Sequence, residues 1–331
     1  MHFDIFNNDA FSLSALTKAI IDTPYVPGRI GELGLFSNEA IQTTGVSLES
    51  MGATLSLVPA AARGAPGKPY GNDKRKLVSV NAIHLPQRTA IVADEVQNLR
   101  AFGKETEVET AQNLMTKKLA RMRRDIDVTM EYQRIGAIKG QILDADGTTV
   151  LLDLTSAGVF NVGPQAHSMV LGTSGTLVIN KVIEAKRKME TALGGLMYKS
   201  IRVLCSASFF DALVAHPAVV KAYDRWMNGE FLRVDNRAGF YFAGVYWEEY
   251  RGNVSGQAFI ADGTALMIPE GVPDLFVTYF APADYMETVN TLGLPYYAKQ
   301  EAMDFNKGIM VEAQSNPLSL CTRPASVIVL S

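Results

Sequence analysis

Residues 104–139, KETEVETAQNLMTKKLARMRRDIDVTMEYQRIGAIK, contain the pattern that decides the fold. Apolar residues recur there every three or four positions and so share one face of a helix. They are Val108, Ala111, Met115, Leu119, Met122, Ile126 and Met130. No proline or glycine interrupts the pattern before Gly136. At about 1.5 Å per residue the helix would be roughly 45–50 Å long, about three times a typical globular helix. The sequence therefore predicts a long helix that lies across a sheet.

The composition of the whole chain is that of an ordinary globular protein. Its residues are 47% hydrophobic and 20% charged. A chain of 331 residues is long enough to bury the cores of two or three domains. A net charge of -3 gives no sign of a surface that coats nucleic acid. The first residues lack the pattern of a signal peptide, and no apolar run approaches the roughly 20 residues that span a membrane. Cys205 and Cys321 lie far apart in apolar segments, so we expect two buried, reduced thiols.

The N-terminal residues 1–42 are expected to form an extended arm. Residues 9–21 could form a short amphipathic helix, after which Pro24, Pro27 and Gly28 favour an extended chain. We find no compact core within this segment.

Residues 43–92 predict a long hairpin. TTGVSLESMGATLSLV (43–58) and KLVSVNAIHLPQRTAIVA (76–93) are typical of long strands. The segment between them is irregular and basic, with Arg63, Lys68, Lys74, Arg75 and Lys76. Two strands alone in water are marginally stable, so the hairpin must lie on another surface. A second copy of the chain could supply that surface; the alternative is a hairpin folded back on its own domain.

The rest of the chain mixes helices and strands. We expect a hairpin after the long helix with Asp146-Gly147 at its turn, and a helix over 177–193 stopped by Gly194-Gly195. Ser206 should cap the next helix and Pro217 should open a further one. Strands follow in the remaining residues without regular alternation with helices. The fold class is therefore α+β.

Residues that could carry catalysis or bind a metal are isolated from one another. The four histidines form no metal-binding pair: His2, His84, His167 and His216. The segment RGAPGK (63–68) departs from a phosphate loop because Pro69 stands where Ser or Thr is needed. A calcium loop through residues 144–147 would need a ligand at Ile142, so a hairpin turn is the better interpretation. We expect no catalytic residue, no cofactor and no metal.

Charged pairs on the long helix and on a later strand are interpreted as solvated. Arg123 and Asp127 lie four residues apart on the helix. An ion pair at this spacing stabilises an exposed helix by about 0.3 kcal/mol. Glu248 and Glu249 are adjacent in a predicted strand. We assign neither of the two carboxylate pairs, Asp125/Asp127 and Glu248/Glu249, to catalysis.

The order of these elements resembles the major capsid proteins of tailed bacteriophages. More narrowly, it is similar to the lambda-like phage major capsid protein E family, which has the Hong Kong 97-type fold. The resemblance covers nearly the whole chain and rests on arrangement and on family-like phrases, without a short catalytic signature. The phrases are YVPGRIGELGLFSNEAIQTTGVSLE, ARGAPGKPYG, KGQILDADG after the long helix, and QEAMDFNKGIMVEAQSNPLSL.

The resemblance implies a division of the chain into four parts. Residues 1–42 would be the N-arm and 43–92 the extended loop. The peripheral domain would comprise 93–190 and 300–331, with the spine helix at about 104–139. Residues 191–299 would form the axial domain, which faces the centre of each pentamer or hexamer.

The function implied is that of the major capsid protein of a tailed bacteriophage, not an enzyme. It would assemble into pentamers and hexamers of an icosahedral shell that encloses double-stranded DNA without sequence-specific binding. It would reside in the virion capsid, and in the host cytoplasm during assembly, with no membrane association. The alternatives are an encapsulin-like shell that holds cargo, or an enzyme with an unrecognised site in 191–299.

The resemblance also implies partners. Because the arm-like sequence begins at Met1, we expect a separate scaffolding protein, together with a portal. Some relatives form Lys–Asn crosslinks, for which Lys68, Lys74 and Lys76 lie near the loop tip, but we favour non-covalent reinforcement by a decoration protein on the outer surface. The basic tip would meet acidic surface on an adjacent subunit; the alternative for that cluster is a solvated turn.

Overall fold

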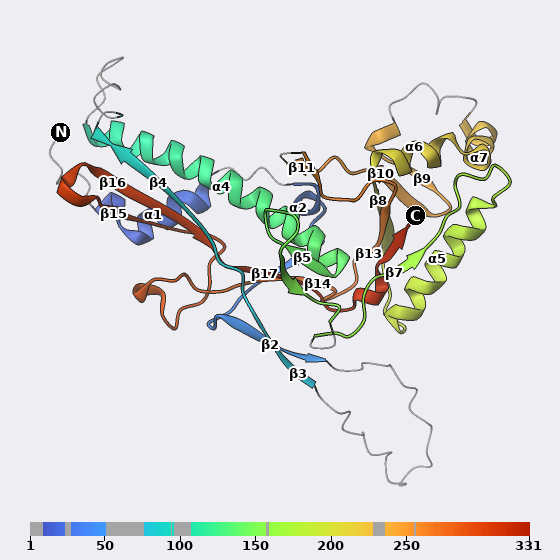
Figure 1. The fold of residues 1–331 in the computed structure, drawn as a ribbon, viewed down its shortest axis with the longest axis horizontal. Coiled ribbons are helices and arrows are strands. Elements are labelled where there is room, and N and C mark those ends of the chain that lie inside the picture. Colours follow the sequence, from blue (N-terminus) through green and yellow to red (C-terminus); the bar gives the residue numbers. More distant parts are fainter. Residues whose placement is uncertain are drawn as a thin grey trace, which may run out of the picture.

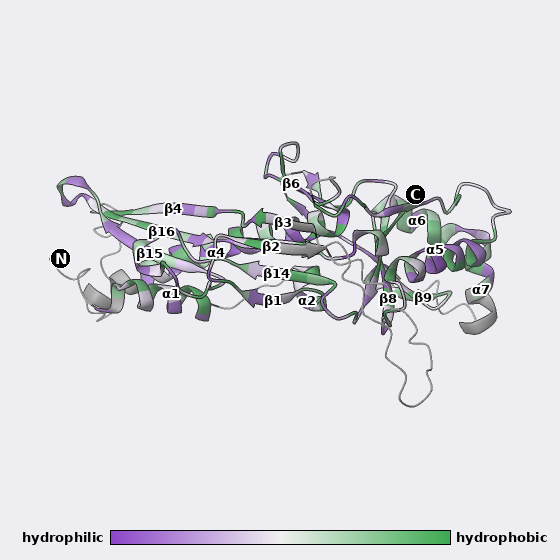
Figure 2. Cartoon of the chain, turned by 90° about the horizontal axis from the view of Figure 1, so that it is seen from below, coloured by the Kyte–Doolittle hydropathy of each residue, from purple (hydrophilic) through white to green (hydrophobic). Residues whose placement is uncertain are grey.

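The molecule is elongated and bent, with two halves of different architecture (Figure 1). The structure is a computed structural model. It describes residues 9–23, 28–50, 76–93, 95, 107–156, 159–227, 236–254 and 256–331. The long helix and one three-stranded sheet form the first half, and a larger sheet with shorter helices forms the second. Seen at right angles, the first half is a flat layer (Figure 2).

Helix α4 (Glu107–Lys139) is the long helix expected from the sequence and contains 33 residues. Its apolar stripe is buried as predicted at Met115, Leu119, Met122, Ile126 and Met130; the side chains of the earlier stripe residues lie outside the described part. The helix ends before Gly140, which has a φ of +86°. Only glycine adopts such a backbone conformation easily. The prediction of a long helix is confirmed.

Helix α4 crosses an antiparallel sheet of order β15-β16-β4, as predicted. The strands are β4 (Leu85–Val92), β15 (Tyr297–Ala302) and β16 (Gly308–Ser315). Helix α1 (Leu13–Asp22) packs against the same layer through Leu16 and Ile20. Between the two halves lies a second sheet, in which an N-terminal strand runs parallel to a strand far along the chain. Its strands are β1 (Ser37–Ala40), β14 (Phe276–Phe280) and β17 (Pro317–Cys321).

The second half is built on a six-stranded sheet of order β7-β18-β13-β8-β10-β9. The strands are β7 (Gln165–His167), β8 (Ser200–Cys205), β9 (Phe240–Phe242), β10 (Val245–Glu249), β13 (Ala265–Glu270) and β18 (Ile328–Leu330). The helices that pack with it are α5 (Val178–Leu193), α6 (Ala207–Ala215) and α7 (Pro217–Met227). As predicted, Ser206 caps α6 by accepting from Phe209 N at 3.4 Å, and Pro217 opens α7.

Side chains from successive residues of this sheet enter two different cores because they alternate across it. Val203 and Met267 pack with the short helices, whereas Leu204 and Ile268 pack with the end of α4. The sheet therefore joins the two halves. Both cysteines are buried free thiols in these cores, as predicted.

Sheet membership differs from the domain division expected from the sequence. β7 and α5 lie in the unit of the six-stranded sheet, although 165–190 was assigned to the peripheral domain. β14 and β15 belong to the other sheets, although they fall within 191–299. The reason is pairing between distant segments, such as β7 beside β18, which no local pattern reveals.

The predicted hairpin is present in its described part, where β2 (Gly45–Ser50) pairs antiparallel with β3 (Lys76–Asn81) and projects from the body (Figure 1). The prediction of one continuous strand over 76–93 is wrong, because residues 82–84 interrupt it and divide it into β3 and β4. From there β4 leaves the hairpin and pairs with β16, and Ile83 N donates to Pro317 O at 3.0 Å.

The remaining elements are short. They are α2 (Arg29–Leu33), β5 (Gln141–Leu143), β6 (Val150–Asp153), β11 (Asn253–Val254) and β12 (Gln257–Ala258). β5 and β6 form the hairpin predicted after the long helix, and Gly147 takes a φ of +70° at its turn. Within the described ranges, no helix combines the length and the apolarity needed to cross a membrane.

Candidate functional site

Most of the predicted contact residues lie outside the described part of the chain. Arg63, Lys68, Lys74 and Arg75 fall outside the described residues, and Lys76 begins β3 opposite Ser50. Their role in contacts between subunits is therefore still a prediction. At the base of the same hairpin, buried Val80 joins the core at the end of α4, so this base rests on its own chain.

A row of charged side chains on α4 is the most elaborate polar feature of the described structure. Arg123, Asp127 and Glu131 lie four residues apart and so share one side of the helix. All three are buried, because the N-terminal segment with α1 and α2 crosses this side. We call these three residues the α4 clamp.

Arg123 holds the end of helix α1. Its Nη1 donates to Ile20 O at 2.6 Å, to Ile21 O at 2.7 Å and also to Thr23 O. These carbonyls belong to the last turn of α1 and the residue after it, where helical partners run out. A cation at this end also interacts favourably with the helix dipole. Its side chain is only 8% exposed, so the contact forms away from water.

Glu131 holds the start of helix α2. Its carboxylate accepts from Ile30 N at 2.7 Å, from Gly31 N at 3.3 Å and from Tyr250 Oη at 3.1 Å. Negative charge is favourable beside the free N–H groups of a first helical turn. Burial raises the pKa of Glu131, and the bond from Ile30 N opposes that rise. A Cβ at Gly28 would lie 2.4 Å from Glu131 Cδ, so only glycine allows this close approach.

Asp127 sits between these two contacts. Its Oδ1 accepts from the hydroxyl of Tyr296, and its Oδ2 lies 3.7 Å from Arg123 Nε. The guanidinium carbon of Arg123 lies 4.7 Å from the centre of the Tyr296 ring, which suits a cation–π contact. Burial raises the pKa of Asp127, opposed by the Tyr296 bond and the Arg123 charge. The expectation of a solvated Arg123–Asp127 pair is therefore wrong, because the N-terminal segment covers it.

A second ion network, centred on the buried Glu248, ties α2 to the six-stranded sheet. Glu248 accepts from Arg29 Nε at 3.0 Å and Nη2 at 2.7 Å, and from Arg202 Nη1 at 2.8 Å. Its side chain is 3% exposed, so the solvated interpretation of Glu248 is also wrong. Arg202 continues the network to Glu270 at 2.5 Å. The N-terminal segment is thus fixed to both halves of the molecule.

Sequence reasoning missed the clamp, although a signal was present. Arg123, Asp127 and Glu131 each directly follow a buried apolar residue of the stripe: Met122, Ile126 and Met130. Charged residues that border an apolar stripe in this regular way become buried when a second segment of the chain packs on the stripe. Every clamp residue has a protein partner. No group of His, Cys, Asp or Glu in the described ranges is arranged to hold a metal ion.

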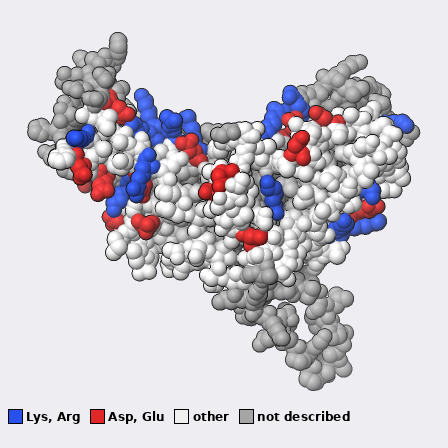
Figure 3. Space-filling model, in the orientation of Figure 1, with Lys and Arg blue, Asp and Glu red and all other residues white. Residues whose placement is uncertain are grey.

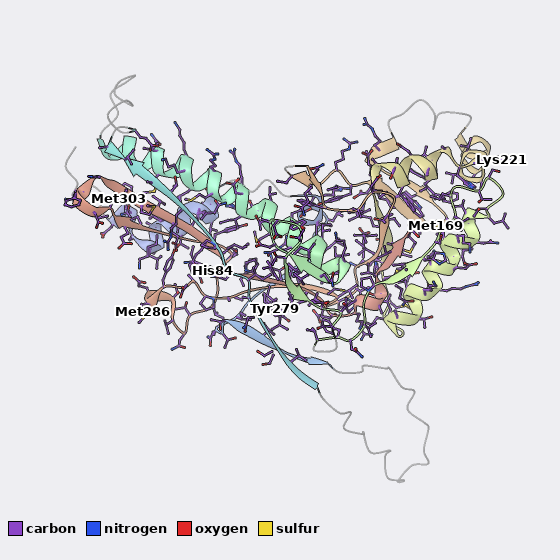
Figure 4. The ribbon with its side chains drawn as sticks, in the orientation of Figure 1. His84, Met169, Lys221, Tyr279, Met286 and Met303 are labelled. Atoms are coloured by element: carbon purple, nitrogen blue, oxygen red, sulfur yellow. The ribbon has the colours of Figure 1, made fainter. Side chains whose placement is uncertain are left out.

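The loop between β14 and β15 exposes apolar side chains on an ordered backbone. We call residues 284–294 the finger. Met286, Val289, Leu292 and Leu294 are exposed, Met286 to 87%. Figure 4 shows Met286 on the loop that projects beside the α4 half. Gly293 N donates to Ile41 O at 2.9 Å, which attaches the finger to the N-terminal segment. Exposed apolar groups held this way are typical of an interaction surface.

The turn between β15 and β16 carries a second exposed apolar group. Phe305 is 91% exposed and has a φ of +59°, which is uncommon for a bulky residue. The finger and this turn both lie in the half of the molecule that carries α4 (Figures 1 and 4).

Comparison with known proteins gives a consistent result. The family model described as phage major capsid protein E matches residues 12–330. The major capsid protein of Pseudomonas phage KPP10 is 28% identical over 344 residues, which cover 96% of both chains. That of Salmonella phage Felix O1 is 26% identical over 358 residues, covering 96% of this chain and 95% of the phage protein.

Solved structures share the fold at low sequence identity. A protein of an E. coli CFT073 prophage, assigned as its capsid protein, is 12% identical with a TM-score of 0.58, over 99% of this chain and 96% of the other. The capsid structure of cyanophage P-SCSP1u is 13% identical with a TM-score of 0.50, over 93% and 89%.

Proposed function

The chain belongs to the phage major capsid protein E family, and from this premise we propose that it builds an icosahedral shell of pentamers and hexamers around packaged double-stranded DNA. Membership makes it a major capsid protein of phage type, a structural component of the virion and not an enzyme. The α+β class and the Hong Kong 97-type fold expected from the sequence are confirmed.

The observation that carries the proposal is the exposed finger. Its apolar side chains find no cover within the described chain, although hydrogen bonds fix its backbone. Burial of apolar surface contributes roughly 25 cal/mol per Å², so a partner that covers the finger gains free energy without ordering it first. In a closed symmetric shell the same contact is repeated by every copy. A second copy of the chain is therefore the natural partner for the finger.

Sheet membership supports a revised domain division as part of this proposal. Residues 1–42 remain the N-arm, here docked through α1, α2 and β1, and the loop that begins at 43 includes β2 and β3. The peripheral domain contains α4 and the β15-β16-β4 sheet. The axial domain is built on the six-stranded sheet, from β7 to β13 together with β18.

Further partners follow from the same proposal. A separate scaffolding protein and a portal would act during assembly in the host cytoplasm, and a decoration protein would reinforce the outer surface without crosslinks. The net charge of -3 suits a container that holds DNA without sequence-specific binding. The basic loop tip would meet acidic surface on an adjacent subunit. No observation favours an encapsulin-like compartment over a phage shell.

Electron microscopy of the purified chain tests the proposal. We expect shells or capsomers from the unaltered chain, whereas a small discrete oligomer at high concentration would contradict it. The variant Met286→Ser/Val289→Ser/Leu292→Ser should fold normally but assemble poorly. Val254→Ser, which alters an exposed valine outside the finger, serves as the control.

A deletion tests the loop separately. Removal of residues 60–78 should leave a folded chain, as judged by circular dichroism, that no longer forms stable shells. Normal particles from this deletion would count against the role of the loop and leave the role of the finger standing.

A further inference from the structure

Helix α5 and edge strand β7 enclose an open groove of about 770 Å³ on the second half of the molecule. Residues of both elements line it, with His167 on the strand side and Lys181, Glu184, Arg187 and Lys188 on the helix side. His167 Nε2 lies 3.0 Å from Lys181 O, and Lys188 Nζ donates to Ala166 O at 3.2 Å. These contacts fix the helix against the strand, so the groove exists before any partner arrives.

The charge of α5 contrasts with that of the whole chain. The helix has four basic residues, Lys181, Lys186, Arg187 and Lys188, and two acidic ones, Glu184 and Glu190. The chain as a whole has a net charge of -3. Basic side chains gather where α5 lies (Figure 3), and much of the helix surface is hydrophilic (Figure 2). Arg187 forms no ion pair with any described residue, which leaves its guanidinium available to an anionic group.

The beginning of α5 exposes apolar side chains beside these cations. Leu177, Ile179 and Ile183 are exposed, Leu177 to 68%, and so is Val170 on the preceding loop. They are not needed for the core, because a different face of α5 already fills it with Val178, Val182, Ala185, Met189 and Leu193. Nothing in the described chain covers the exposed set.

We propose that the α5–β7 groove, with the apolar start of α5, is a docking surface for an acidic amphipathic helix of another protein. Carboxylates of that helix would pair with Lys181, Arg187 and Lys188. Its apolar stripe would cover Leu177 and Ile183, which lie four positions before Lys181 and Arg187 and so on the same sides of α5. Such a two-part match places apolar anchors beside charge pairs and so gives both affinity and orientation.

The same features favour a protein over nucleic acid. A phosphate backbone would be attracted to the cations, but it has no apolar surface with which to cover Leu177 and Ile183. It would also be repelled by the half-exposed carboxylate of Glu184 in the groove, which already pairs with Lys181 Nζ at 3.2 Å. A protein segment can add an N–H group or a basic side chain of its own to that pair.

A synthetic peptide tests the proposal on the full-length chain. The probe is a fluorescein-labelled 14-residue helix with leucine on one face and glutamate elsewhere, followed by fluorescence anisotropy. We expect saturable binding that Lys181→Glu/Arg187→Glu weakens about tenfold or more, the order of effect expected when complementary charges are reversed. Ile183→Ser should also weaken it. Lys221→Glu, on α7 (Figure 4), makes the same kind of charge change outside the groove and should leave binding unchanged.

Several outcomes would overturn the proposal. The first is that the peptide does not bind, and the second is that it binds the double variant and the unaltered chain equally. The third is that duplex DNA displaces the peptide while Ile183→Ser changes the binding of neither probe. Thermal unfolding shows whether each variant is folded. Shell assembly is scored separately by electron microscopy, so a chain that assembles yet fails to bind the peptide rejects only this proposal.

Discussion

Helices α4 and α5 are both amphipathic and both rich in charge, but their charged faces have opposite surroundings. On α4, Arg123, Asp127 and Glu131 are buried beneath the N-terminal segment. On α5, Arg187 and Glu184 face solvent across an open groove. Helical spacing thus identifies the face on which charges lie, whereas a distant segment of the chain decides whether that face is covered.

The difference has a direct energetic consequence. A charge removed from water must be compensated by hydrogen bonds or by an opposite charge. The clamp provides much of this compensation, with three carbonyl oxygens around Nη1 of Arg123 and three donors around Glu131. On α5, water provides it. Equivalent substitutions in the two helices should therefore differ greatly in their effect on stability.

The largest effect is expected for Glu131→Ala. The substitution leaves Ile30 N, Gly31 N and Tyr250 Oη without an acceptor in a buried site, so the free energy of unfolding should fall by about 3 kcal/mol. Urea denaturation of the unassembled chain, followed by circular dichroism, measures it. The control is Glu184→Ala on α5, which should change stability by less than about 0.5 kcal/mol. Equal effects of the two substitutions would remove the distinction between the helices.

A smaller, local effect is expected for Arg123→Met. Loss of the guanidinium frees the carbonyls at the end of α1, so this helix should open more often and its amides should exchange about tenfold faster or more. Hydrogen exchange read by mass spectrometry reports on α1 and α5 in one experiment. Arg124→Met alters the next residue, which is exposed, and should leave α1 unchanged. Unchanged exchange in Arg123→Met would show that α1 is held by apolar packing alone.

The pH dependence of stability should sharpen the picture of Glu131. Burial raises its pKa in the folded chain above the ordinary value of 4.5. The folded state therefore binds this proton more tightly than the unfolded state. The resulting stability is complete below about pH 4.5 and is lost as pH rises through the raised pKa.

Glu131→Gln removes that titration while keeping the shape of the side chain. Relative to the unaltered chain, the variant should gain stability as pH rises above 4.5. Urea midpoints between pH 4 and pH 8 measure the difference, and Asp127 contributes the same slope to both chains. A difference that stays constant over this range would contradict the raised pKa.

The smallest effects are expected on the exposed face of α5. Arg187→Gln should change the free energy of unfolding by less than about 0.5 kcal/mol, because this side chain is exposed to solvent and forms no ion pair with a described residue. Thermal or urea unfolding of the unassembled chain measures this. A loss of several kcal/mol would mean that this face is covered within the chain itself and would end the contrast with α4.

Much of the fold was predictable where the signals are local. The apolar stripe on α4 predicted a long helix. The pair Gly194-Gly195 predicted the end of α5, and Gly194 does end that helix, with a φ of +64°. The Ser206 cap and the Asp146-Gly147 turn were likewise confirmed. In each case the residues that interact lie within a few positions of one another, so their spacing alone reveals the structure.

Other features could not be predicted from local spacing. The strand predicted over 76–93 was split because β16 competes for its second part. The solvated pairs were buried because the N-terminal segment covers Asp127 and because Arg29 and Arg202 enclose Glu248. The basic loop tip stays a prediction, since it lies outside the described residues.

The sequence by itself determined the helices, their caps and turns, the α+β class and a resemblance to phage capsid proteins. Only the tertiary structure decided which faces are covered, which strands pair and which charges are buried. The reason is distance along the chain: Ile30 bonds to Glu131 across 101 positions, and Thr17 to Ala298 across 281. Contacts of that kind depend on how the whole chain packs, and no short segment encodes them.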